Sequence, residues 1–189
     1  SLGSFIGGIS TAWTSVVGQD LQQPNNSMSI EPISDYEASW IVAFTPIGMM
    51  TTMLFLGSNM CELFGRKKTA LIHAFINIVV WLMRYLTTDL NVLLIAQLLH
   101  GASDGIAALV IPLYITEISS DSIRGSLGSL YMFGIKSGYF AGFTLVAVAP
   151  IKLSAGYMII LPVALLVGLL LIPESPLYSI RNNRIDEAG

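Results

Sequence analysis

The sequence predicts an all-α membrane protein with six transmembrane helices. Of its 189 residues, 53% are hydrophobic and 11% are charged, whereas soluble domains carry about 25% charged residues. The apolar residues gather into six runs, each close to the length of about 20 residues that a helix needs to cross a bilayer. We place the helices at about 2–17, 38–60, 69–88, 91–115, 126–149 and 153–172, which makes 1–180 one bundle and 181–189 the start of a cytoplasmic linker.

Polar segments and prolines delimit the individual runs. An acidic stretch without lysine or arginine separates the first run from the second, and a basic cluster at 66–68 separates the second from the third. The second, fourth and sixth runs contain Pro46, Pro112 and Pro162, and each proline leaves a backbone carbonyl without its donor. We therefore expect kinks there. Because the chain begins at Ser1 without a methionine, we expect it to be a piece of a longer protein.

Glycines mark the faces on which the fourth and fifth helices approach their neighbours. Gly101 and Gly105 recur at a spacing of four residues in the fourth run, and Gly134, Gly138 and Gly142 do so in the fifth. Small residues at this spacing let helix backbones come close together inside a membrane. The pattern predicts tight helix packing.

Positive charge gathers on one side of the predicted bundle. Six lysines and arginines lie on that side and two on the other, so the first side is expected to be cytoplasmic, together with the N-terminus. The segment between the first two runs is then external, and its Asn25-Asn26-Ser27 is an acceptor pattern for a glycan on Asn25. We expect a multi-pass protein of the plasma membrane. The inner residues are Arg66, Lys67, Lys68, Arg124, Arg181 and Arg184, and the outer ones are Arg84 and Lys152.

Three motifs lie at the cytoplasmic ends of successive helix pairs. They are Glu62-Leu63-Phe64-Gly65-Arg66-Lys67-Lys68, then Pro112-Leu113-Tyr114-Ile115-Thr116-Glu117-Ile118 with Arg124-Gly125-Ser126-Leu127-Gly128-Ser129-Leu130, and last Pro173-Glu174-Ser175-Pro176-Leu177-Tyr178. In order, spacing and side they resemble the sugar porter family of the major facilitator superfamily. Ser39-Trp40-Ile41 and the Glu62-x-x-Gly65-Arg66 spacing are similar to the insect facilitated trehalose transporter branch. The resemblance implies the N-terminal six-helix half of a major facilitator fold, whose partner is the missing C-terminal half.

The charged residues of these motifs are interpreted as a cytoplasmic gate. Acids and arginines at neighbouring helix ends would pair in the outward-facing state and separate when the bundle rocks. The alternative is that they are solvated charges that obey the positive-inside rule, and we prefer it for Lys67 and Lys68. The predicted gate residues are Glu62, Gly65, Arg66, Glu117, Arg124, Gly125 and Glu174.

The sequence departs from the family pattern at three polar positions. The pattern places arginine where this chain has Gln97, a sugar-contacting glutamine where it has Met132, and arginine where it has Leu177. The first run also lacks an acid, so the carboxylate and arginine pair that couples protons in the family's symporters has no counterpart. The resemblance therefore implies facilitated diffusion.

Two other charges lie within the predicted crossings. Asp104 is 13 residues from Glu117 and Lys136 is 12 residues from Arg124, which places both about 18 to 20 Å from the cytoplasmic end. An unpaired charge at a helix centre costs about 2.5 to 3.5 kcal/mol to insert. Since their depths match, we expect an ion pair between Asp104 and Lys136, either direct or through water.

The remaining polar residues suggest a route for substrate. Gln97, His100 and Asp104 share one helix face, which predicts either a water-filled pathway or a buried packing seam. His73 is expected to be a hydrogen-bonded packing residue. In the first run, the hydroxyl of Thr11 and the indole of Trp13 would contact a sugar. The predicted pathway residues are Thr11, Trp13, Gln97, His100, Asp104, Met132 and Lys136.

Two functions compete at this point. One is the transport of a sugar or polyol, trehalose or a hexose, by alternating access between two six-helix halves. The other is a transporter-like sensor, or an inactive truncated copy. No metal-ligand cluster, nucleophile triad or phosphate loop is visible, so we expect neither an enzyme nor a metal or cofactor. The expected partners are the sugar, the lipid bilayer and the missing half, and no nucleic acid.

Overall fold

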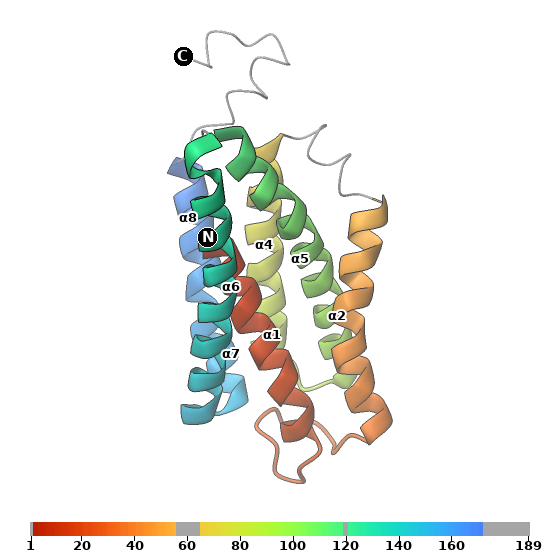
Figure 1. Ribbon diagram of the computed structural model, residues 1–189. Coiled ribbons are helices and arrows are strands. Elements are labelled where there is room, and N and C mark those ends of the chain that lie inside the picture. The colour runs from red at the N-terminus through yellow and green to blue at the C-terminus, as the bar shows by residue number, and fades with distance from the viewer. Residues whose placement is uncertain (1, 56–64, 119–120, 172–189) are drawn as a thin grey trace.

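The computed structural model describes residues 2–55, 65–118 and 121–171, and within these ranges every regular element is an α-helix (Figure 1). Each predicted run corresponds to a helix or, for the sixth, to two helices in succession. The helices are α1 (Leu2–Leu21), α2 (Asp35–Phe55), α4 (Arg66–Leu86), α5 (Leu90–Ile118), α6 (Asp121–Val148), α7 (Ile151–Met158) and α8 (Ile160–Leu171).

The proline in the sixth run accounts for its division into α7 and α8. Pro162 has no backbone N–H, so it cannot donate to the carbonyl of Met158, where α7 ends. The helix is interrupted at Ile159, and the predicted kink stays a prediction. In contrast, α2 and α5 are continuous through Pro46 and Pro112.

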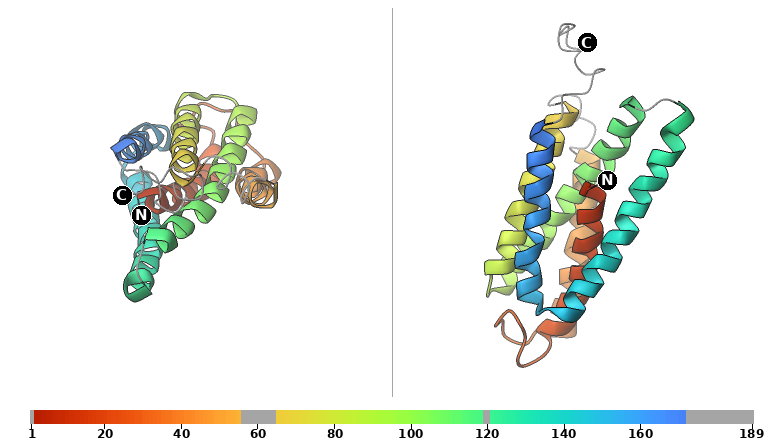
Figure 2. Two further views of the ribbon diagram at one scale, coloured as in Figure 1. Left: turned by 90° about the horizontal axis from the view of Figure 1, so that it is seen from above. Right: turned by 90° about the vertical axis from the view of Figure 1, so that its left-hand side faces the viewer.

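The helices form a bundle in which successive helices run in opposite directions, except that α7 and α8 follow each other in the same direction (Figures 1 and 2). α1 packs along α6, α2 along α5, and α4 lies between α5 and α8. The connections at 22–34, 87–89 and 149–150 gather at one end, while α1 begins and α8 ends toward the other. Among the described residues, four segments are long and apolar enough to cross a membrane by composition alone: α2, most of α4 and α5, and α7 with α8.

Glycines allow the closest contacts between these helices, as predicted. A Cβ atom on Gly138 of α6 would overlap the carbonyl oxygen of Phe5 in α1. In the same way, a Cβ atom on Gly101 of α5 would overlap the carbonyl oxygen of Thr45 in α2. Each pair of backbones therefore touches, and a larger residue would push the two helices apart.

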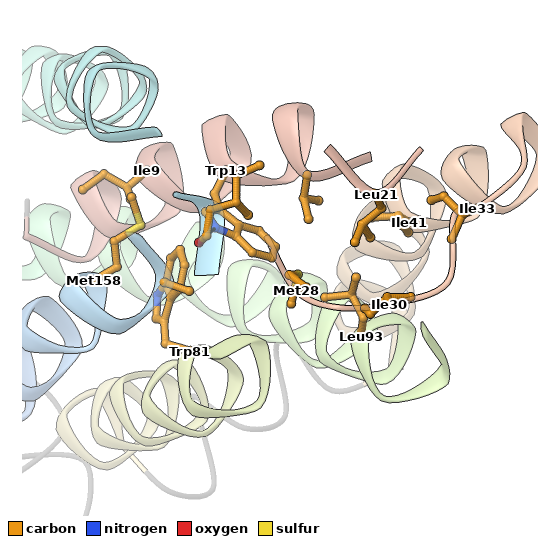
Figure 3. Packing of buried hydrophobic residues seen from close by; sticks show 13 residues of the cluster. Ile9, Trp13, Leu21, Met28, Ile30, Ile33, Ile41, Trp81, Leu93 and Met158 are labelled. Carbon is orange, nitrogen blue, oxygen red and sulfur yellow. Dashed lines mark hydrogen bonds between the residues drawn. The ribbon is translucent and has the colours of Figure 1, made fainter. Parts of the chain in front are cut away.

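The apolar core lies toward the end of the bundle that carries the 22–34 connection (Figure 3). That connection folds back over the helix ends, and it buries Met28, Ile30 and Ile33 in the core. Its shape is fixed by two polar side chains, because Asn26 bonds the backbone of Ile30 and Asp20 accepts from Ser27. Asn25 remains exposed on its outer surface.

A buried polar centre and the exposed strip of α1

Three helices, α1, α4 and α5, enclose a group of polar side chains that we call the polar centre. Arg84 from α4, Gln97 and His100 from α5, and Ser10 from α1 are 0% exposed, and Thr14 from α1 is 5% exposed. Buried polar groups need hydrogen-bond partners because desolvation without them is costly. In the polar centre these side chains supply many of the partners for one another, although Arg84 Nε and Gln97 Nε2 have no hydrogen-bond partner among the described residues.

Arg84 holds the polar centre together. One terminal nitrogen of its guanidinium donates to Ser10 Oγ, and the other donates to Gln97 Oε1 and, at 3.5 Å, to Thr14 Oγ1. The guanidinium carbon also lies 4.7 Å from the ring centres of both Trp13 and Trp81. A cation over an aromatic face is attracted by the ring quadrupole, most strongly when water is excluded.

His100 connects the polar centre to a carboxylate. Its Nδ1 lies 3.4 Å from Ser10 Oγ, and its Nε2 lies 3.3 Å from Oδ2 of Asp104. The Asp104 side chain is 21% exposed and lies beside Gly7 of α1. Asp104 therefore stands at the edge of the centre, where it provides a negative charge near the buried Arg84.

A second buried group continues the polar residues of α4 and α5 toward the other end of the bundle. Ser103 Oγ lies 2.8 Å from His73 Nδ1, and Asn77 donates to the same hydroxyl at 2.8 Å. Thus His73 is a hydrogen-bonded packing residue, as expected.

Polar residues face outward on the other side of α1. Thr11, Ser15 and Gln19 recur every fourth residue and are exposed, so they form a line along the helix. The hydroxyls of Thr11 and Ser15 donate to α1 carbonyls one turn earlier, which leaves their lone pairs free to accept. We call these three residues the exposed strip of α1, and Asp104 at Gly7 borders it.

The structure divides the predicted pathway residues into three groups. Thr11 and Asp104 lie at the exposed strip, as a pathway requires. Gln97 and His100 lie in a buried seam between α1, α4 and α5, which is the alternative that the sequence left open. Met132 and Lys136 are exposed on α6, whose glycine face packs on α1.

Trp13 does not occupy the position expected for a sugar contact. It is 0% exposed, its ring meets Trp81 edge to face, and its Nε1 donates to the carbonyl of Ile151 at 3.1 Å. Its face is covered by Arg84 rather than open to a ligand. The expectation of a sugar contact is corrected accordingly, since the indole is part of the core.

Asp104 and Lys136 lie at the same depth but do not form the expected direct ion pair. Asp104 lies beside Gly7 of α1, and residues 135–138 of α6 lie at the adjacent Gly8. Among the described residues, the side chain that pairs with the Asp104 carboxylate is His100. The Lys136 ammonium instead lies 5.3 Å from the ring centre of Tyr139. The matching depths agree with the prediction, whereas the rotation of each helix could not be predicted, and a pair through water stays a prediction.

The predicted gate is described only in part. Glu62 and Glu174 lie outside the described residues, and so do the side chains of Arg66, Glu117 and Arg124. Gly65 has a φ of 84°, which favours glycine, and its carbonyl accepts the hydroxyl of Thr69 at 2.6 Å. Gly125 is exposed with open space around its Cα. Gly65 therefore fixes where α4 begins, and the gate remains a prediction.

Sequence reasoning missed Arg84, the residue with the most contacts in the polar centre. It was assigned to the outer side of the membrane by charge counting, because it stands near the end of its run. A local signal was present, since Thr69, His73, Asn77 and Arg84 fall on one face of α4 at helical spacing. A continuous polar face on an apolar helix indicates a buried seam.

Trp13→Phe is expected to destabilise the bundle. The variant keeps an aromatic ring in the core but loses the hydrogen bond to Ile151, which is worth about 1 kcal/mol. The unfolding midpoint in detergent should fall below that of the wild type. An unchanged midpoint would contradict the assignment of Trp13 to the core.

Known proteins resemble this chain over its whole length. The family model described as "Sugar (and other) transporter" matches residues 1–189. The facilitated trehalose transporter Tret1 of Anopheles gambiae is 33% identical over 192 residues, which cover 100% of this chain and 23% of that transporter. Sugar transporter ERD6-like 6 of Arabidopsis thaliana is 33% identical over 156 residues, which cover 82% of this chain and 31% of that protein.

The fold matches a solved transporter structure. The xylose transporter XylE from E. coli, in a partially occluded inward open conformation, superposes with a TM-score of 0.83 at 21% identity. The match covers 99% of this chain and 50% of that chain. This chain thus spans half of the solved chain, and less than a third of either curated relative described above.

Proposed function

Because the chain belongs to the sugar (and other) transporter family and forms the N-terminal six-helix half of a major facilitator sugar porter, we propose that the complete protein carries a sugar across a membrane. The substrate class is trehalose or a hexose, the mode is facilitated diffusion, and the route passes between this half and the missing C-terminal half by alternating access. The protein performs no chemistry on its substrate.

The observation that carries this proposal is the exposed strip of α1 with Asp104 at its border. A carboxylate in the middle of an apolar bundle needs water or a polar ligand. A sugar offers hydroxyls that donate to Asp104 and to the free lone pairs of Thr11 and Ser15. The arrangement suits a polyhydroxylated solute.

The absence of an acid in the membrane-spanning part of α1 supports facilitated diffusion. Within Leu2–Leu21 the single acid is Asp20, and its carboxylate accepts from Ser27 in the external connection. The helix therefore supplies no carboxylate opposite Gln97. Net flux would then follow the sugar gradient alone.

We further propose that the 22–34 connection is external and that Asn25 carries a glycan. Asn25 is exposed, and its connection lies at the end of the bundle opposite the start of α1. In cells that glycosylate proteins, the wild type should migrate faster on a gel after glycosidase treatment. The untreated Asn25→Gln variant should migrate at the position of the treated wild type. An unchanged mobility of the wild type would contradict the glycan.

One observation favours a sensor without turnover as a second candidate. Gln97 and His100 are sealed in the polar centre and Met132 carries no hydrogen-bonding group, so few polar side chains remain to hold a sugar. A weakly held sugar could bias a conformation without being carried.

Uptake by the complete protein in proteoliposomes tests the proposal. Labelled trehalose and glucose should enter until the inner and outer concentrations are equal, and neither a pH gradient nor a protonophore should change that endpoint. Sugar-dependent stabilisation without uptake would indicate the sensor. Accumulation above the outer concentration, abolished by the protonophore, would indicate coupled transport.

A further inference from the structure

The side chains of Arg84 and Gln97 meet end to end in the polar centre. Arg84 crosses from α4 to donate to Gln97 Oε1, and that same oxygen accepts the hydroxyl of Thr14 at 3.3 Å. Thr14 is also within 3.5 Å of the guanidinium. The side chains of Arg84 and Gln97 therefore both reach the hydroxyl of Thr14, and one guanidinium fills the contact between the two positions.

The bonds of Arg84 to α1 favour one rotation of that helix. Ser10 and Thr14, which bond Arg84, are one turn apart on the buried side of α1. Thr11 and Ser15 follow them directly in the sequence and lie on the exposed strip. Because each residue turns a helix by 100°, bonds that fix Ser10 and Thr14 also fix the direction in which Thr11 and Ser15 point.

We propose that Arg84 is a positioning residue for the exposed strip of α1, and that the polar centre requires one guanidinium that either α4 or α5 can supply. Arg84 is fully buried, so it acts through α1 and does not touch the substrate. The positioning of sugar contacts rests on the proposed function, whereas the requirement for one shared cation is a property of the bundle.

If the polar centre requires one guanidinium, the arginine at position 84 and the glutamine at position 97 can exchange places. Arg84→Gln removes the cation and leaves Ser10 and Thr14 without their charged donor. Gln97→Arg alone places two guanidiniums beside each other in the buried polar centre, where Asp104 is the acid at its edge. Combining both substitutions restores one cation and one amide acceptor, now exchanged between the helices.

The test compares these three variants of the complete protein with the wild type and with Leu93→Ala as a control. Leu93 is 0% exposed in the apolar core, so its truncation destabilises the bundle without touching the polar centre. Two quantities are measured for each protein. They are the unfolding midpoint in detergent and, in proteoliposomes, KM and kcat for trehalose and glucose uptake.

Arg84→Gln is expected to raise KM about tenfold, because a hydrogen bond from a charged group is lost. The exchange variant, which combines Arg84→Gln with Gln97→Arg, should return KM most of the way to the wild-type value. Leu93→Ala should lower the midpoint and leave KM unchanged. An exchange variant at least as impaired in KM and midpoint as Arg84→Gln would overturn the proposal. If the wild type takes up neither sugar, the proposed function fails. The unfolding midpoint of the exchange variant, compared with that of Arg84→Gln, still decides whether the polar centre requires one shared cation.

Discussion

Gly138→Ala is expected to disrupt the packing of α6 on α1. The added methyl group would overlap the carbonyl oxygen of Phe5 and approach the Cα of Gly8. These are backbone atoms, which cannot turn aside as the end of a flexible side chain can. Overpacking of this kind costs about 1 to 3 kcal/mol and occasionally more. The unfolding midpoint in detergent should fall, with less monodisperse protein recovered on size exclusion.

The matched control lies on the same helix. Gly128 has open space around its Cα, and alanine is the better helix former by about 1 kcal/mol, so Gly128→Ala should match or exceed the wild-type midpoint. Equal behaviour of the two variants would show that α6 does not pack on α1 through Gly138.

Asp104→Asn is expected to reduce sugar uptake by the complete protein at least about tenfold, because a hydrogen bond to a charged group is worth about 1.5 to 3 kcal/mol. The variant keeps the size of the side chain but removes the charge that borders the exposed strip. It also removes the negative charge that lies 3.3 Å from His100 at the edge of the polar centre. Initial uptake rates over a range of trehalose concentrations measure the effect.

Glu31→Gln provides the control for Asp104→Asn. Glu31 is exposed in the 22–34 connection, so the same loss of one carboxylate there should leave uptake unchanged. Wild-type uptake by Asp104→Asn in folded protein would remove Asp104 from the pathway.

The features that could be predicted from the sequence are those encoded along a single helix. Apolar runs predicted the positions of the helices, and the spacing of Gly138 and its neighbours predicted that α6 packs closely on another helix. Pro162 predicted an irregularity in the sixth run, where α7 and α8 are separated. Each follows from the local geometry of one segment. The common depth of Asp104 and Lys136 was predictable for the same reason, since rise per residue is fixed.

The features that could not be predicted depend on how helices turn toward one another. Arg84 bonds Ser10, which is 74 residues away. The polar face of α4 indicates a buried seam, but it does not show which helix supplies the partners on the other side. Trp13 is ambiguous in the same way, because an indole in a crossing suits either a core or a ligand site. Charge counting treated Arg84 as an outer residue, although its partners hold it inside the bundle.

Cysteine accessibility at two adjacent residues of α1 tests most directly whether the exposed strip lines the sugar pathway. The complete protein is prepared without its native cysteines, then with Thr11→Cys or Ser10→Cys, and treated with a small charged thiol reagent. We predict that Thr11→Cys reacts and is protected by the transported sugar, while Ser10→Cys does not react because Arg84 and His100 enclose it. An unreactive Thr11→Cys in folded protein, or a reactive Ser10→Cys, would contradict the account.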